Sequence, residues 1–312
     1  MKKYLFIGGA GFIGSNLIKC LLQYGRFEIH VAEPFFANLQ RLNVEDVVIH
    51  RVSINDIQAI RTLIVTNHID VVVHLVSTIV PGSTYDDFIS EFTNVTFPTV
   101  RLMEICAENK VKFVYFSSGG TIYGNRKELE KSGFQETEDM APISYYGWSK
   151  QMMENGILFM HRTQGLEYII IRPSNPYGKG QDIYGKQGLI AVALGKVLNH
   201  EPITVFGDGS AIRDYIYISD LVEAVCQILC LEDARNMTLN IGSGIGYSIN
   251  EVLDIISGVV NEELDIKYIE SRKSDVSSII LNIEKLKTLI DFSPRTLEEG
   301  VKEFYSYLQN EQ

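Results

Sequence analysis

The sequence predicts an α/β protein with a doubly wound parallel sheet, followed by a smaller region of mixed α/β structure. In the first 172 residues, short apolar runs alternate with longer stretches whose apolar residues recur at helical spacing. This alternation is typical of βαβ units, in which a helix connects two parallel strands. Val71-Val72-Val73 is continuously apolar, as expected of a strand that is covered on both faces. After Arg172, Gly and Pro become frequent, which indicates a second, less regular region.

The expected elements follow one another along the chain. Strands are expected at residues 4–7, 28–32, 47–51, 71–75, 112–117 and 168–172. Helices are expected at residues 14–23, 57–67, 96–109 and 146–164. A strand and a helix return at 212–229, and one more strand is expected at 237–241. We therefore predict a first domain at 1–172, with a returning segment at about 212–242, and a second domain at 173–312.

Composition narrows the class of protein. The 28 Lys and Arg residues against 39 Asp and Glu residues give a net charge of −11, which disfavours a nucleic-acid binder. Four cysteines are too few for a disulfide scaffold, and no nearby His or second Cys pair joins Cys226 and Cys230 in a metal site. No apolar run has the length of a membrane span. We expect a cytoplasmic protein with no bound metal, no nucleic-acid partner and no membrane association.

The first chemical motif is a glycine-rich turn between the first strand and the first helix. Its sequence, Gly8-Gly9-Ala10-Gly11-Phe12-Ile13-Gly14, has the spacing GxxGxxG. Gly8 would permit the tight turn, Gly11 would let the backbone approach a pyrophosphate, and Gly14 would let helix and strand pack closely. The helix N-terminus would face the phosphates with its partial positive charge. The motif predicts a dinucleotide cofactor and a sheet of the Rossmann type.

Glu33 indicates which dinucleotide is bound. It follows Gly14 by 19 residues and ends the expected second strand. A carboxylate there can accept hydrogen bonds from both ribose hydroxyls of NAD. It would repel the 2′-phosphate of NADP, and Pro34-Phe35-Phe36 offers no arginine to bind one. We therefore expect NAD.

The second motif places a tyrosine and a lysine on one face of a helix. Tyr146 and Lys150 are four residues apart, so their Cβ atoms would lie about 5–6 Å from each other. A tyrosine has an ordinary pKa of about 10 and is a poor base at neutral pH. A neighbouring ammonium and a cationic nicotinamide ring would favour the phenolate. Tyr145 is a rival for the base, but its partner four residues on is Ser149, which carries no charge.

Five motifs in order resemble landmarks of the extended short-chain dehydrogenase/reductase family, and within it of the NAD-dependent nucleotide-sugar epimerases. Two are the glycine turn and Tyr146 with Lys150. The others are Phe116-Ser117-Ser118-Gly119-Gly120-Thr121-Ile122-Tyr123-Gly124, Arg172-Pro173-Ser174-Asn175-Pro176-Tyr177-Gly178 and Arg213-Asp214-Tyr215-Ile216. The resemblance covers nearly the whole chain. It implies that the first domain binds NAD and that the second mainly binds substrate.

The resemblance also implies roles for individual residues. Besides Glu33, Tyr146, Lys150 and the glycines, it assigns to the cofactor site Phe12, Ile13, Leu75, Val76, Ser77, Asn94, Ser117 and Pro173. It assigns to the sugar diphosphate the side chains of Asn175, Arg213 and Arg272, and places Asp275 near the nucleotide ribose. This set makes a UDP-linked sugar the expected substrate.

The chain departs from the family at Gly119. The family usually has Ser or Thr there, whose hydroxyl bonds the substrate, so another hydroxyl has to take this role. Thr121 is our first choice, because alternate residues of an extended segment point the same way. Ser118 is the close alternative, and Tyr146 also contacts the substrate in this scheme.

Epimerisation at C4 of a UDP-linked hexose, through a 4-keto intermediate, is the expected reaction. The base, the ammonium and the cofactor suffice for it. Dehydratases of the family carry Asp-Glu where this chain has Gly120-Thr121, so no acid–base pair for loss of water is present. A reductase or dehydratase of the same family, and a non-catalytic NAD-binding sensor, are the alternatives.

The family resemblance further implies a homodimer. Its members pair the two helices expected here at 96–109 and 146–164. Six apolar side chains could form the shared face: Leu102, Met103, Met152, Met153, Ile157 and Met160. The alternative is that they pack only against their own sheet.

Overall fold

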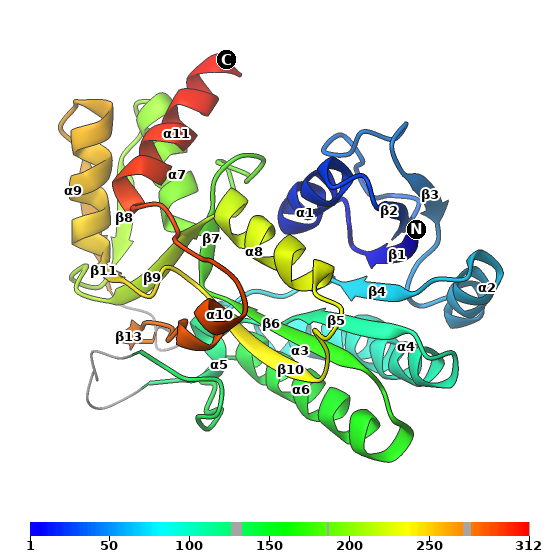
Figure 1. Ribbon diagram of the computed structural model, residues 1–312. Helices are drawn as coiled ribbons and strands as arrows, with labels where there is room; N and C mark the ends of the chain where they lie inside the picture. The colour runs from blue at the N-terminus through cyan, green and yellow to red at the C-terminus, as the bar shows by residue number, and fades with distance from the viewer. Residues whose placement is uncertain (126–132, 186, 271–275, 312) are drawn as a thin grey trace. The chain divides into compact units, whose positions relative to one another are not determined.

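The computed structural model describes residues 1–125, 133–185, 187–270 and 276–311 (Figure 1). Backbone contacts divide the chain into two compact units, each built from three stretches. Unit 1 consists of Met1–Ser118, Ser144–Arg172 and Val225–Leu239. Unit 2 consists of Gly119–Ile143, Pro173–Ala224 and Asn240–Gln312. The assignment of NAD to one domain and substrate to the other stays a prediction, because these units are defined by contacts within the chain alone.

A seven-stranded sheet runs through unit 1 in the order β10-β6-β5-β4-β1-β2-β3. The strands are β1 (Lys2–Ile7), β2 (Phe27–Glu33), β3 (Val48–Arg51), β4 (Val71–His74), β5 (Lys112–Phe116), β6 (Tyr168–Pro173) and β10 (Met237–Ile241). All neighbours from β3 to β6 pair in parallel. Each of the strands expected before residue 173 is present, within two residues of its expected ends.

The helices of unit 1 are α1 (Phe12–Gln23), α2 (Ile57–Asn67), α3 (Tyr85–Glu91), the π-helical η1 (Phe92–Thr96), α4 (Phe97–Glu108) and α6 (Tyr145–Gln164). Four of them, namely α1, α2, α4 and α6, begin and end within two residues of their expected bounds, whereas α3 and η1 were not expected. Helix α8 (Ile218–Cys230) contributes its last residues to unit 1. For α2, Asp56 fixes the start, since its side chain accepts a hydrogen bond from the Ala59 N–H group.

Both faces of the sheet are covered, which confirms the doubly wound parallel fold. On one face, Leu5 and Ile7 of β1 share a core with buried side chains of α2, α4 and α6. On the other face, Phe6 lies beside Ile18 of α1, as the close surroundings of Gly9 show. Successive β1 side chains therefore point to opposite layers.

The side chains assigned to a dimer face are in this core. Leu102, Met103, Met153, Ile157 and Met160 are buried within unit 1 against the sheet and α2, whereas Met152 is half-buried. The expectation that these five side chains form a shared face between two copies is wrong. Helical spacing shows which residues share a face but not what covers that face.

The order of the strands reverses between β1 and β4. The chain first adds β2 and β3 on one side of β1 and then returns to lay β4 on the other side. The loops after β1 and β4 therefore leave the same edge of the sheet side by side, and the N–H group of Leu75 donates to the carbonyl oxygen of Ile7 at 3.0 Å. Ligands of such sheets bind at this reversal point.

Unit 2 is less regular and is built around β9. In this sheet, β11 pairs antiparallel with β9, and β7 and β13 pair parallel with it; β8 and β12 form a separate parallel pair. The strands are β7 (Asn175–Tyr177), β8 (Ile203–Phe206), β9 (Ile212–Tyr217), β11 (Gly246–Ser248), β12 (Ile266–Ile269) and β13 (Ser278–Ile279). The helices are α5 (Gly119–Ile122), α7 (Leu189–Leu198), α9 (Ile249–Val260), α10 (Glu284–Leu289) and α11 (Leu297–Asn310). Among the described residues, no helix combines the length and apolar character needed to span a membrane.

Candidate active site

The glycine turn after β1 is crowded at Gly8 and Gly14 and open at Gly11. Gly8 has a φ of +83°, and a Cβ atom there would lie 2.7 Å from Cγ2 of Val76. A Cβ atom on Gly14 would lie 2.6 Å from the carbonyl oxygen of Gly9. A Cβ atom on Gly11 would lie 3.5 Å from the Gly8 carbonyl oxygen, which is an ordinary contact distance. The turn therefore leaves space at Gly11, where a pyrophosphate is expected.

Helix α1 supports the same use of the turn. Gly11 is its N-cap residue and supplies no side-chain hydrogen bond to the first turn, to which Phe12 and Ile13 belong. The N–H groups of this turn have no helical acceptor and carry the positive end of the helix dipole. An open, uncapped helix N-terminus at the reversal point of a parallel sheet fits the phosphates of NAD.

Glu33 is part of the turn itself. It is 6% exposed at the end of β2, and its Oε1 atom accepts a hydrogen bond of 2.7 Å from the Ala10 N–H group. Burial raises the pKa of this carboxyl, while the Ala10 hydrogen bond and the charge of Arg51 act in the opposite direction. The sequence did not reveal the contact with Ala10. Binding of the ribose by Glu33 stays a prediction.

The segment after β4 is held between the glycine turn and a buried acid. Val76 lies against Gly8. The next two residues, Ser77 and Thr78, contact Glu91 at the end of α3. The Glu91 carboxylate, only 3% exposed, accepts from the Thr78 N–H at 2.8 Å, from Thr78 Oγ1 at 2.5 Å and from Ser77 Oγ at 3.2 Å. Glu91 therefore fixes the segment that contains the predicted cofactor residues.

Tyr146 and Lys150 lie in the first turns of α6, where the sequence placed them. Ser144 caps this helix by accepting from the Gly147 N–H group at 3.1 Å. The Lys150 ammonium lies 5.5 Å from the centre of the Tyr146 ring and donates to the Phe116 carbonyl oxygen at 3.0 Å. The Tyr146 hydroxyl forms a hydrogen bond with the side chain of Ser118.

Electrostatics around this pair follow from burial. Burial lowers the pKa of Lys150 from 10.5 to about 8, while the carboxylates of Glu91 and Glu154 act in the opposite direction. Burial raises the pKa of Tyr146 above 10.0, and its hydrogen bond with Ser118 opposes that rise. Glu154 is bound by the Arg172 guanidinium through contacts of 3.0 and 2.6 Å, so its charge is already paired.

A neutral histidine lies behind the pair. Burial lowers the pKa of His74 to about 3, and its Nε2 atom is 2.9 Å from the hydroxyl of Thr99 on α4. The charge of Lys150 also lowers this pKa. His74 therefore adds no second positive charge next to Lys150 in the neutral pH range.

The expectation that residues 119–121 are extended is wrong. They begin a short helix, α5, in which residues two apart point about 200° away from each other. Thr121, which is half-buried, does not share the direction of a side chain at 119. Ser118, the alternative, is the residue that bonds Tyr146. The roles of both hydroxyls stay predictions.

Other predicted residues lie at several places. Ser117 follows β5 directly, and its buried hydroxyl has no hydrogen-bond partner among the described residues, as suits a ligand-facing group. Asn94 is exposed, and its side chain donates to the Ser90 carbonyl oxygen at 3.0 Å; its place in the cofactor site stays a prediction. Arg272 and Asp275 lie outside the described residues.

In unit 2, Asn175 and Arg213 lie on the paired strands β7 and β9. The Asn175 Nδ2 atom donates to the Asp214 carbonyl oxygen at 2.7 Å. Arg213 is half-buried, and Pro173, at the end of β6, is buried. Among the buried polar residues that sequence analysis did not single out are Glu91, His74, Glu154 and Asp214. Of these residues, only Asp214 lies within one of the motifs noted in the sequence, Arg213-Asp214-Tyr215-Ile216.

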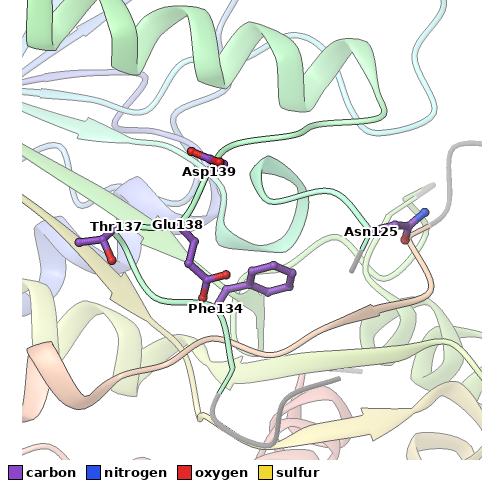
Figure 2. Close-up of a pocket in the computed structure, with 5 residues that line it drawn as sticks. All are labelled: Asn125, Phe134, Thr137, Glu138 and Asp139. Carbon is purple, nitrogen blue, oxygen red and sulfur yellow. The ribbon is translucent and has the colours of Figure 1, made fainter. Parts of the chain in front are cut away.

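A pocket in unit 2 is lined by a different set of residues. It has a volume of about 410 Å³ and is lined by Asn125, Phe134, Thr137, Glu138 and Asp139. Figure 2 shows the Glu138 and Phe134 side chains lying close together, with Asn125 on a separate segment. No predicted site residue that the structure describes is among these five.

Comparison with known proteins gives the family. The model of the "NAD dependent epimerase/dehydratase family" matches residues 4–242. The structure of UDP-glucose 4-epimerase from Thermotoga maritima with UDP-glucose is 30% identical, with a TM-score of 0.91 over 99% of each chain. The corresponding Thermus thermophilus enzyme, in complex with NAD, is 27% identical, with a TM-score of 0.90 over 98% of this chain and 99% of that one. An Escherichia coli relative named dTDP-4-dehydro-6-deoxyglucose reductase is 30% identical over 95% of this chain and 94% of its own. The chain therefore belongs to the NAD dependent epimerase/dehydratase family, and its cofactor is NAD.

Proposed function

We propose that the protein is a nucleotide-sugar 4-epimerase that inverts C4 of a UDP-linked hexose through a 4-keto intermediate. The observation that carries this proposal is the chain of contacts in unit 1 from Ser118 to Tyr146 and from Lys150 to Phe116. It provides a base, a hydroxyl that stabilises the phenolate and a fixed ammonium. We assign NAD to the domain at 1–172 with its returning segment, and the sugar nucleotide mainly to 173–312.

The residues divide the work between proton transfer and positioning. Tyr146 takes the proton of the sugar 4-hydroxyl and later returns it, with Ser118 or Thr121 bonding the same oxygen. NAD, when bound, supplies the acceptor and the donor of the hydride. Lys150 holds the nicotinamide ribose and favours the Tyr146 phenolate by its charge. Asn175, Arg213 and Arg272 hold the diphosphate, so binding energy far from C4 keeps the intermediate in place.

A reductase is the second candidate function, because the Escherichia coli relative carries that name. A reductase consumes one reduced cofactor for each product, whereas an epimerase ends with the NAD it began with. A dehydratase fits less well, because Gly120 and Thr121 stand where a pair of carboxylates would be needed.

The deciding experiment measures product and cofactor together. Purified protein is incubated separately with UDP-glucose, UDP-galactose and their N-acetylated forms, and the sugars are resolved. We expect interconversion of one pair without net change in NADH absorbance. Tyr146→Phe should lose nearly all turnover, while Tyr145→Phe, its matched control, should keep most of it. Stoichiometric oxidation of NADH with a 4-keto sugar nucleotide, without interconversion of any pair, would instead identify a reductase.

We further propose that the protein acts as a homodimer in the cytoplasm. The four cysteines are free thiols, as a reducing compartment requires. With the predicted apolar face buried in unit 1, other side chains have to form the interface. Large apolar residues of α4 and α6 are exposed instead, namely Phe97, Trp148 and Phe159.

A further inference from the structure

Phe88 on α3 packs against the turn of α6 that carries the proposed base. Its ring, only 5% exposed, has its centre 5.4 Å from that of the Tyr145 ring, with an interplanar angle of 25°. The same ring lies 4.9 Å from the indole of Trp148, with an interplanar angle of 18°. Tyr146 stands between these two residues in the sequence. One side chain of α3 therefore contacts α6 both before and after Tyr146.

The stacked rings and the pair of Tyr146 and Lys150 lie on different faces of α6. At about 100° per residue, Tyr145 and Trp148 project about 60° apart around the helix axis. Tyr146 and Lys150 project about 40° apart, and the middle of their face is about 150° from the middle of the first. Phe88 therefore contacts α6 on the side away from the proposed base.

The first turn of α6 depends on packing for its fixed position. The first N–H groups of a helix have no acceptor within it, and Ser144 satisfies one of them by accepting from Gly147 at 3.1 Å. The residues directly before Ser144 belong to unit 2, so the chain returns to unit 1 at this turn. Stacked aromatic rings stabilise each other beyond the burial of their surface. The contacts of Phe88 therefore help to set the direction in which the side chains of this turn point.

Helix α3 is itself anchored at both ends. Thr84 and Asp87 form a capping box at its start, with hydrogen bonds of 2.8 and 3.3 Å between side chains and backbone N–H groups. At its last residue, Glu91 accepts from the Thr78 N–H group at 2.8 Å. A helix of seven residues is not stable alone, so these contacts fix the position of Phe88. Through them, α3 connects the start of α6 to the segment predicted to bind the cofactor.

We propose that Phe88 is a positioning residue for Tyr146. By stacking on the two neighbouring rings of α6, it holds the first turn so that the Tyr146 hydroxyl keeps the geometry that proton transfer requires. The effect on turnover rests on the proposed function, in which Tyr146 is the base. The stabilisation of the helix turn by Phe88 does not depend on that function.

Trp148 provides a direct test, because it is the single tryptophan of the chain. Time-resolved fluorescence anisotropy is measured on the NAD-loaded protein without substrate. In the parent we expect the indole to move only with the whole protein. In Phe88→Leu, a nanosecond component of local motion should appear, since the stacked ring is gone. Quenching by acrylamide should increase in the same variant.

Steady-state kinetics with the productive UDP-sugar test the consequence for Tyr146. Phe88→Leu should lower kcat by about tenfold, less than the 10²-fold that a misplacement of 1 Å can cause. Its KM and its affinity for NAD should stay near those of the parent, because no binding group is changed. Tyr145→Leu, at an exposed position where folding is not at risk, should show a similar loss of kcat. Tyr145→Phe keeps the ring and should keep the rate.

The control for a general loss of stability is Phe304→Leu, which removes the same atoms from a buried site on α11. It should lower the free energy of unfolding and leave kcat near the parental value. Unchanged anisotropy in Phe88→Leu would overturn the proposal. So would a parental kcat in Tyr145→Leu, or an equal loss of kcat in Phe304→Leu. Anisotropy that changes as expected, in a parent that turns over no UDP-sugar, would support the stacking and contradict the proposed function.

Discussion

Leu281 occupies the space into which a side chain at Gly119 would extend. A Cβ atom there would lie 2.6 Å from Cδ1 of Leu281 and 3.0 Å from the carbonyl oxygen of Pro173. Gly119→Ser should therefore destabilise the protein by about 1–3 kcal/mol through overpacking. In Gly119→Ser/Leu281→Ala the two changes should offset each other. Denaturant unfolding of the parent, the two single variants and the double variant measures the coupling between the two positions. Strictly additive changes in the free energy of unfolding would contradict the close fit.

Ser118 and Thr121 can be separated by their hydroxyls. Because Ser118 bonds the Tyr146 hydroxyl, Ser118→Ala should lower kcat by about 10²-fold while NAD stays bound. Thr121→Val keeps the shape of its side chain and removes its hydroxyl. If Thr121→Val loses most of its kcat while Ser118→Ala turns over at nearly the parental rate, the hydroxyl that bonds the substrate is that of Thr121. Both variants are compared by steady-state kinetics with the productive UDP-sugar.

Glu33 combines charge with a contact inside the glycine turn. Glu33→Gln can keep an oxygen for the Ala10 N–H group and removes only the charge. It should bind NAD with about tenfold lower affinity and discriminate less against NADP, since the repulsion of the 2′-phosphate is gone. Glu33→Ala should bind NAD more weakly still, because the turn loses its partner. If the ratio of the NAD and NADP affinities is the same in all three proteins, Glu33 does not select the cofactor.

Glu91 should tune the pH profile of the reaction. Its negative charge raises the pKa of both Lys150 and Tyr146. In Glu91→Gln both values should fall, so both limbs of the kcat/KM profile should move to lower pH. The amide can keep the Thr78 contacts through its oxygen. Thr78→Val, which removes one of these hydrogen bonds but no charge, should leave the profile where it is, and a Glu91→Gln profile equal to the parent's would refute the charge effect.

Dimerisation should depend on exposed aromatic side chains of α4 and α6, the two helices that the family resemblance implies are paired in a dimer. Phe97 is 60% exposed and Phe159 is 52% exposed. Replacing both with Asp should shift a dimer toward monomer in sedimentation at micromolar concentration, because burying a carboxylate in an apolar interface is costly. Tyr184→Asp, at a 72% exposed side chain of unit 2, is the control. A parent protein that sediments as a monomer would contradict the dimer.

Periodicity predicted most of the first unit, because most of its elements are long or continuously apolar; it did not predict the short helices α3 and η1. Helix α2 spans the expected residues 57–67, since apolar spacing and the Asp56 cap agree. The same patterns placed Tyr146 and Lys150 on one helix. They could not predict the helix at residues 119–122, because Gly119 and Gly120 have no side chains and therefore contribute nothing to apolar periodicity.

Asn94 lies in a stretch whose backbone geometry could not be predicted, for a different reason. It lies within η1, where the backbone turns with π-helical geometry between two α-helical stretches. Such a turn holds one residue more than an α-helical turn and rotates the side chains that follow. Local propensity carries no signal for it. Glu91 was missed because an acid on an amphipathic helix is ordinarily solvated, and only the tertiary contacts with Thr78 show otherwise.

The division of unit 1 into three stretches has a consequence for biosynthesis. Its last stretch, Val225–Leu239, includes the start of β10, which lies beside β6 in the sheet. On the ribosome, the sheet cannot be completed until β10, which ends at Ile241, has emerged. Until then β6 is an edge strand with unpaired backbone groups, the kind of surface that pairs wrongly with another nascent chain. A chain truncated before residue 237 should therefore aggregate during translation, whereas one truncated within α11 should retain the whole sheet.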